Sequence, residues 1–161
     1  MFKKLYPTFL LLLALSTILI YGMPVYVDHG FTDTSVSVYE AMFLPHFIFP
    51  SLFFFLALMV ALVMMAYFIV TLLALLNIRF TKVTAFVESI NLRLDWVMPL
   101  TFVALMIGGL VFDILYAITK NAGQADPVVS IGVAPILLIL FGVIVAGIGF
   151  YMPKITAEKD H

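Results

Sequence analysis

Four long, almost uncharged apolar runs constrain this sequence more than any other feature. They cover about residues 5–22, 48–77, 96–119 and 128–152, and Asp113 is the one charged residue inside them. A helix needs about 20 apolar residues to cross the hydrocarbon core of a bilayer. Because every backbone polar group in hydrocarbon must be paired within its segment, runs of this length span only as helices. We therefore expect an all-α fold, a four-helix transmembrane bundle that forms a single domain over residues 1–161.

The composition agrees with a membrane protein and excludes several other classes. Hydrophobic residues make up 65% of the chain and charged residues 11%, whereas soluble domains are about half apolar and about a quarter charged. The net charge of -1 leaves no strongly basic surface for nucleic acid. The chain has no cysteine, which excludes disulfide frameworks, thiolate metal sites and thiol catalysis.

The first run begins like a secretory signal, with Lys3 and Lys4 ahead of an apolar core. It lacks the small-x-small pattern at which signal peptides are cleaved, because Tyr21, Gly22 and Met23 follow the core. We therefore expect this run to be retained as the first spanning helix.

The basic residues divide unequally between the two ends of the expected bundle. Those at the termini and between the second and third runs are Lys3, Lys4, Arg79, Lys82, Arg93, Lys154 and Lys159, and only Lys120 lies in another loop. The positive-inside rule then predicts an N-in/C-in topology with the middle connector in the cytoplasm. That connector, about 79–95, is amphipathic. It fits either a helix in the inner membrane interface or a solvated connecting helix.

The longest polar stretch is an external loop of 25 residues at positions 23–47. Within it, Ser37 and Glu40 have the spacing of a helical capping box, which predicts a short helix that ends before Pro45. The alternation of residues 34–39 also permits a short strand. At the fourth run, Pro135 either kinks the helix or opens it after an irregular segment at 128–134.

Small residues in the third and fourth runs mark candidate faces for close helix packing, because they let two helix backbones approach. The candidates are Ala104, Gly108, Gly109, Gly142, Ala146 and Gly149. Such faces suit packing within one chain or between two copies of it.

Asp113 is the candidate polar group inside the membrane. It shares a helical face with Gly109 and Ala117, which lie four residues before and after it, so we expect it to point into the bundle. An ionisable residue in a spanning helix is a functional-site hypothesis by default. Asp113 also lies about one turn from the external end, where a structural role costs less than at the helix centre. Lys120, seven residues on and on the same face, is its candidate partner.

The external loop contains residue types that bind metals, but without a recognised ligand spacing. The candidates are Asp28, His29, Asp33, Glu40 and His46. No histidine lies in the core of an apolar run, so axial haem ligation is not expected and no cofactor is predicted. The sequence shows no Ser/His/Asp constellation, no glycine-rich phosphate loop and no pair of intramembrane aspartates. We therefore expect a protein that is not an enzyme.

Two local stretches carry a resemblance to a known family. One is Leu-Leu-Ala-Leu-Leu-Asn at 72–77, and the other is Gln-Ala-Asp-Pro at 124–127, which leads through Gly132 into an apolar run. With them, the chain resembles a bacterial family of small four-helix integral membrane proteins of unknown function, often encoded beside a small helix-turn-helix regulator. A fainter likeness, through Met-Pro-Val at 23–25 and Val-Glu at 87–88, is to paraquat-inducible membrane proteins. It implies lipid-transport partners, although the cysteine motifs of that family are absent.

These observations favour a non-enzymatic integral membrane protein of the bacterial inner membrane. We expect an accessory, regulatory or protective subunit that acts through helix contacts and its external loop. Its expected partners are the lipid bilayer and either another membrane protein or further copies of itself, and not nucleic acid. The alternative is a small oligomeric transporter or channel subunit in which Asp113 is the intramembrane polar group.

Overall fold

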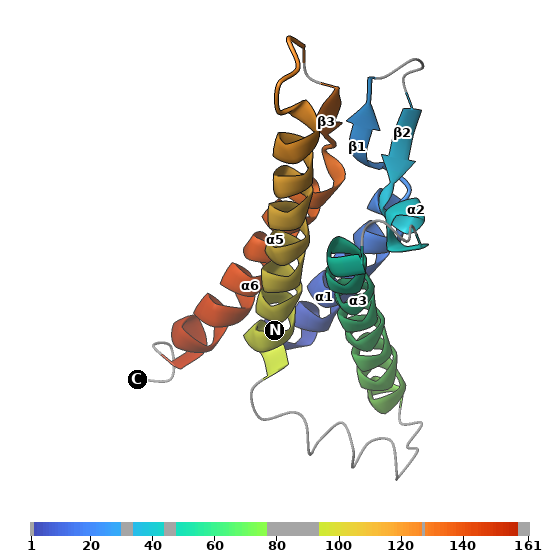
Figure 1. Ribbon diagram of the computed structural model, residues 1–161. Coiled ribbons are helices and arrows are strands. Elements are labelled where there is room, and N and C mark those ends of the chain that lie inside the picture. Colours follow the sequence, from blue (N-terminus) through green and yellow to red (C-terminus); the bar gives the residue numbers. More distant parts are fainter. Residues whose placement is uncertain (1, 30–33, 44–47, 77–93, 127, 158–161) are drawn as a thin grey trace.

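The computed structural model describes residues 2–29, 34–43, 48–76, 94–126 and 128–157 of the chain. Its long helices are α1 (Phe2–Ile20), α3 (Ile48–Leu75), α5 (Leu94–Asn121) and α6 (Ala134–Ala157). The shorter elements are β1 (Pro24–Asp28), β2 (Thr34–Ser37), α2 (Val38–Phe43) and β3 (Val129–Ile131). The described part of the protein is therefore mostly helical, with a small sheet (Figure 1).

Within the described ranges, three helices are long and apolar enough to cross a membrane. Their apolar windows are Pro50–Leu73 of α3, Trp96–Asn121 of α5 and Ala134–Tyr151 of α6. Spanning length is therefore confirmed for the second, third and fourth apolar runs. The apolar part of α1, Tyr6–Ile20, is shorter. It measures about 22 Å at about 1.5 Å per residue, against a hydrocarbon core of about 30 Å.

The four long helices contact one another in a closed series. α1 packs on α3, α3 on α5, α5 on α6, and α6 back on α1. The strands and α2 lie together at one end of these helices, which we call the sheet end (Figure 1). Helices α1 and α5 end there, while α3 and α6 begin there, so successive long helices run in opposite directions.

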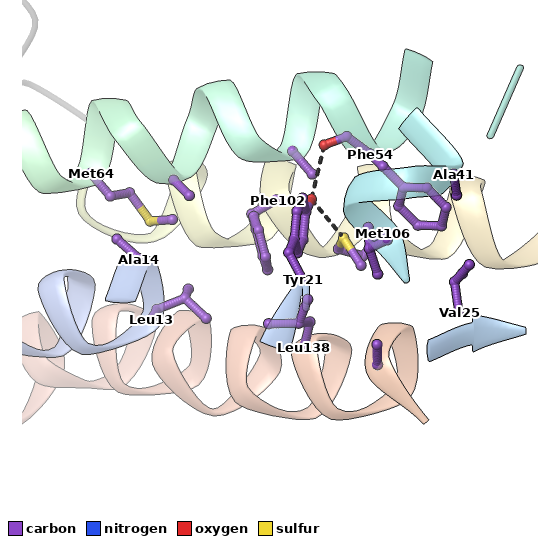
Figure 2. Packing of buried hydrophobic residues seen from close by; sticks show 14 of the residues in the cluster. Leu13, Ala14, Tyr21, Val25, Ala41, Phe54, Met64, Phe102, Met106 and Leu138 are labelled. Atoms are coloured by element: carbon purple, nitrogen blue, oxygen red, sulfur yellow. Dashed lines mark hydrogen bonds between the residues drawn. The ribbon is translucent and has the colours of Figure 1, made fainter. Parts of the chain in front are cut away.

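Side chains from all four long helices form one buried core. Leu13 of α1, Phe102 of α5 and Leu138 of α6 lie around Tyr21, which follows α1, while the Phe54 ring of α3 packs toward Ala41 (Figure 2). The opposite helix faces are apolar but exposed, and only 22% of the Pro50–Leu73 window is buried. Exposing such faces to water costs about 25 cal/mol for each Å². Lipid tails are as apolar as these side chains, so the same surface is suited to a bilayer.

A small antiparallel sheet covers the sheet end, which makes the expectation of an all-α fold wrong in this respect. Among the described residues its strand order is β2-β1-β3, and Tyr26 of β1 pairs with Val36 on one side and Ile131 on the other. The register shifts between Pro24 and Tyr26. This bulge explains how the successive residues Val25 and Tyr26 are both buried.

Residues 34–43 contain both structures that their sequence permits. Thr34–Ser37 forms β2, and α2 follows directly at Val38. The Ser37 hydroxyl accepts a hydrogen bond from the Glu40 N–H at 3.2 Å, and the Glu40 carboxylate accepts one from the Ser37 N–H at 2.7 Å. The capping box is therefore confirmed. It satisfies free N–H groups at the point where strand pairing stops and the helix begins.

The fourth helix begins at Ala134 and not at residue 128, because Val129–Ile131 forms β3 instead. Pro135 lies in the first turn of α6, where a missing N–H breaks no helical hydrogen bond. Of the two alternatives for Pro135, the opening of the helix after a non-helical segment is confirmed. The other long helices have bounds within a few residues of the expected ones. The predicted amphipathic connector lies outside the described residues up to position 93.

Gly132 lets the chain pass close to the start of β1. Its N–H donates a hydrogen bond of 2.7 Å to the Val25 carbonyl oxygen. A Cβ atom at position 132 would overlap the carbonyl oxygen and carbon of Pro24. Backbone atoms cannot swing aside as the end of a flexible side chain can, so this approach requires glycine.

We predict that Gly132→Ala destabilises the protein by about 1–3 kcal/mol, because the sheet must move away from Pro24 to accommodate the methyl group. Thermal unfolding in detergent micelles measures the effect. The matched control is Gly147→Ala in α6, where an added Cβ meets nothing within 4 Å. Alanine is the better helix former by up to about 1 kcal/mol, so the control is expected to be neutral or stabilising. Equal losses in both variants would contradict the role assigned to Gly132.

Candidate functional site

Asp113 lies on the buried face of α5, just below the sheet end. Met106, Gly109, Asp113 and Ala117 follow one another at intervals of three or four residues, and all four are buried. Asp113 itself is 3% exposed. Neither of its carboxyl oxygens has a hydrogen-bond partner. It is therefore an acid enclosed by protein on a helix of spanning length, and its burial agrees with its helical position.

A buried carboxyl group without a partner is unusual, because about 90% or more of buried polar groups in proteins are hydrogen-bonded. Burying a polar group without a compensating bond costs about 1–3 kcal/mol, and burying an unpaired charge costs far more. Lys120 does not compensate this cost, since neither Asp113 oxygen has a hydrogen-bond partner. Its Nζ atom lies instead 5.7 Å from the centre of the Tyr116 ring, as a cation–π contact.

The sheet places a phenol group near this acid. Tyr26 of β1 is 7% exposed, and its ring centre lies 5.9 Å from that of Tyr116 on α5. Burial is the main cause that raises the pKa of Tyr26 to about 12, and Tyr116 adds to the shift. The acidic groups of Asp113, Asp28 and Glu40 raise this pKa further. The Tyr26 phenol is therefore neutral across the physiological pH range and keeps its O–H donor.

Glycines in α5 hold α3 close to this region. A Cβ atom on Gly109 would lie 2.5 Å from Cε1 of Phe54, and one on Gly108 would lie 2.7 Å from the Phe53 ring. A Cβ atom on Gly142 of α6 would overlap Val103 of α5. These three packing candidates therefore lie at close helix contacts. Of the other three, Gly149 is buried, Ala146 is partly buried and Ala104 is exposed.

Tyr21, which follows α1, contacts both α3 and α5 (Figure 2). Its hydroxyl donates a hydrogen bond of 2.8 Å to the Phe54 carbonyl oxygen of α3 and lies 3.6 Å from the Met106 sulfur of α5. Its ring meets Tyr39 edge-to-face at 5.5 Å. Tyr39 in turn donates to the Ile18 carbonyl oxygen of α1 at 2.8 Å. The sheet end is thus rigidly connected to the helices.

Asn121 fixes the other side of the region, at the end of α5. Its side-chain oxygen accepts the N–H groups of Val128 and Val129, and its Nδ2 donates to the Val129 carbonyl oxygen, each at 2.8 Å. Gly123, with a φ of 80°, turns the chain after the helix. Because β3 begins at Val129, one side chain anchors the sheet to α5.

The predicted metal ligands of the external loop are not brought together. Among the described residues, no group of three or more His, Cys, Asp or Glu residues is placed to hold a metal ion. Glu40 is used by the capping box, and His29 Nε2 lies 2.9 Å from the Ser130 hydroxyl of β3. Asp28 lies on β1, while Asp33 and His46 lie outside the described residues.

Sequence reasoning missed the contributions of Tyr26, Asn121 and Gly132. The end of α5 carried a usable signal, because Gly123 lies two residues after Asn121 and a glycine just past the last turn is typical of a helix end. The roles of Tyr26 and Gly132 depend on pairing between segments more than 100 residues apart in sequence. No local pattern identifies such a pairing.

Comparison with known proteins provides no family for this fold and site. No family model, curated protein or solved structure matched the chain.

We predict that acid weakens the start of α2 through Glu40. Hydrogen bonds from the Ser37 N–H, and then from its hydroxyl, hold the pKa of Glu40 below its usual value. A carboxylate whose pKa is lowered by folding stabilises the fold above its unfolded pKa, about 4.3, and loses that contribution as the pH falls through the folded value. Wild type is therefore expected to lose more stability on acidification than Glu40→Gln, which keeps a capping oxygen without the titration.

Thermal unfolding followed by circular dichroism between about pH 7 and pH 3 compares the two proteins across the range in which glutamate titrates. Glu40→Ala, which removes the capping oxygen, serves as the reference for a lost cap. Identical acid dependence in wild type and Glu40→Gln would contradict this account.

Proposed function

We propose that this chain is an integral membrane protein that crosses the bilayer four times, with both termini and residues 77–93 in the cytoplasm. Three helices of spanning length support this proposal. The whole of α1, 19 residues, measures about 28 Å, close to the hydrocarbon thickness. Lys3 and Lys4 occupy its first turn in the sequence, and basic residues at a helix end suit a membrane interface. The seven basic residues at one end favour this orientation, and the sheet is then external.

The function that this arrangement supports best is that of a non-enzymatic accessory, regulatory or protective subunit. The observation that carries the proposal is the broad apolar surface of α3, whose large exposed side chains are Leu52, Phe55, Leu56, Met59, Leu62, Val63, Ile69 and Leu72. The buried core already joins the long helices to one another. This outer surface is therefore available to lipid or to a helix of a partner. The same proposal places the protein in the bacterial inner membrane. It also relates the chain to the small four-helix membrane proteins that its sequence resembles.

A second function is favoured by one specific observation, the enclosed and unpartnered carboxyl group of Asp113. Functional acids in spanning segments typically face the interior of a bundle. We propose as the alternative a small oligomeric transporter or channel subunit that uses this acid. Four helices line a continuous pathway only if several protomers associate, so this alternative requires a homo-oligomer.

Single-cysteine labelling tests the topology, because the chain has no native cysteine. We expect Ser35→Cys and Asp126→Cys, both exposed at the sheet end, to react with a membrane-impermeant thiol reagent on intact cells. Lys82→Cys and Lys159→Cys are expected to react only after permeabilisation. Labelling of Asp126→Cys and Lys82→Cys from the same side would overturn the four-crossing topology.

Asp113→Asn distinguishes the two functions. If the protein is an accessory subunit, wild type and Asp113→Asn are expected to co-purify with the same membrane protein in mild detergent. Neither protein is then expected to show flux in proteoliposomes. A transporter or channel subunit is expected to form a homo-oligomer by native mass spectrometry and to lose ion flux in the variant. A monomer with neither a partner nor flux would contradict both functions.

A further inference from the structure

The carboxyl group of Asp113 is the one buried polar side chain that the described fold leaves without a partner, and its surroundings restrict what it binds. We infer that Asp113 is a proton-binding site: its carboxyl group holds an exchangeable proton while the sheet covers the end of α5. The inference names a ligand that the transporter alternative leaves open. It goes beyond both proposed functions, because it concerns the state of this group whether or not the protein carries flux.

The neighbours of Asp113 do not supply the ligands of a metal ion. Calcium takes six to eight oxygen ligands, and magnesium requires a near-octahedral set. Along the buried face of α5, the adjacent positions are Gly109 and Ala117, which have no side-chain donor atoms. The Pro50–Leu73 window of α3 and the Ala134–Tyr151 window of α6 contain no charged residue. Among the described residues, no cluster of metal-ligating side chains includes Asp113.

An organic cation does not fit the enclosed group either. Asp113 is 3% exposed and both its oxygens are buried. A hollow of about 550 Å³ lies between α5 and β3, and its lining includes Ile114, Ala117 and Ile131 but not Asp113. A ligand of that size therefore reaches the next turn of the helix but not the carboxyl group. A proton needs no cavity and no further ligand, and it neutralises the charge that burial opposes.

The same hollow provides the route for exchange. Ala117 lies on the Asp113 face of α5, one turn farther on, and lines the hollow. Ile131, which also lines it, pairs directly with Tyr26 of β1. A small separation of the sheet from α5 would therefore connect Asp113 with water in this hollow. The O–H bond of the carboxyl group then breaks, and the proton passes to that water.

Titratable groups from β1, α2 and α5 gather near the Tyr26 phenol, on which Asp113 also acts. β1 contributes Tyr26 and Asp28, and α2 contributes Glu40 near the same phenol. α5 contributes Tyr116 and Lys120, which are in contact with each other. An ionised Asp113 would place a further negative charge near the Tyr26 phenol, on which Asp28 and Glu40 already act. Its only nearby cation on α5, Lys120, would have to leave the Tyr116 ring to neutralise it.

Infrared difference spectroscopy of the protein in lipid nanodiscs tests this inference at neutral pH. Wild type and the control Asp126→Asn, which changes an exposed acid, are expected to show the C=O stretch of one protonated carboxyl group. That band should shift on transfer to D₂O and should be lost in Asp113→Asn. Spectra without a difference between wild type and Asp113→Asn would overturn the proposal. So would a carboxylate band of Asp113 that responds to sodium or calcium.

Asp113→Leu provides an independent test that does not depend on the asparagine variant. A neutral carboxyl group without hydrogen bonds is replaced at little cost by an apolar side chain, so this variant is expected to unfold at the same temperature as wild type or higher. A large loss of thermal stability would show that the carboxylate makes an essential ionic contact and would overturn the proton site. If the protein shows no flux, the transporter alternative fails. The results expected for the infrared band and for Asp113→Leu stay the same.

Discussion

The close contact between two phenylalanine rings of α3 and two glycines of α5 determines how the rest of the protein is placed. Any side chain at Gly109 would collide with the Phe54 ring. The Phe54 carbonyl oxygen also accepts a hydrogen bond from the Tyr21 hydroxyl. Phe54 of α3 therefore contacts both α5 and the residue that follows α1. Because Asp113 follows Gly109 by one turn, the packing that brings α3 and α5 together also closes the space beside the acid.

Helix packing alone does not account for the burial of Asp113, because the sheet contributes the cover. β1 supplies Tyr26, whose ring rests against Tyr116. Asn121 binds the backbone at the start of β3, and Gly132 allows β3 to pass close to Pro24. The contacts of Tyr116 and Asn121 join the last turns of the apolar α5 window to the sheet. The sheet end therefore combines a rigid polar scaffold with an apolar interior, which is an environment in which a single carboxyl group strongly affects its neighbours.

The sequence predicted the parts of this structure that depend on local chemistry. Apolar length identified the long helices, the Ser37 and Glu40 pair identified the start of α2, and Pro135 marked the opening of α6. The spacing of Gly109, Asp113 and Ala117 placed the acid on a buried face. The sheet was missed because its central strand finds partners on both sides, and the partner β3 is only three residues long. A strand of that length inside an apolar run shows no detectable alternation.

The candidate site, like the fold, was predictable only where it depends on local sequence. Asp113 was identified because charge is rare in spanning segments, whereas the proximity of Tyr26 was not predictable from sequence. The expected pairing of Lys120 with Asp113 followed from their shared face. In the structure, Lys120 lies over the nearer Tyr116 ring, and a cation on an exposed helix end gains little by leaving water for an enclosed acid.

The sheet joins the beginning of the protein to its end. β1 directly follows α1 and β3 directly precedes α6, so that His29 and Ser130, 101 residues apart, come into contact. During synthesis, β1 therefore emerges long before its second partner exists, and one of its edges has no neighbour until β3 is made. Completion of the sheet thus requires β3, which follows α5 in the chain. A chain interrupted before β3 would leave one edge of β1 unpaired, and an open strand edge promotes aggregation.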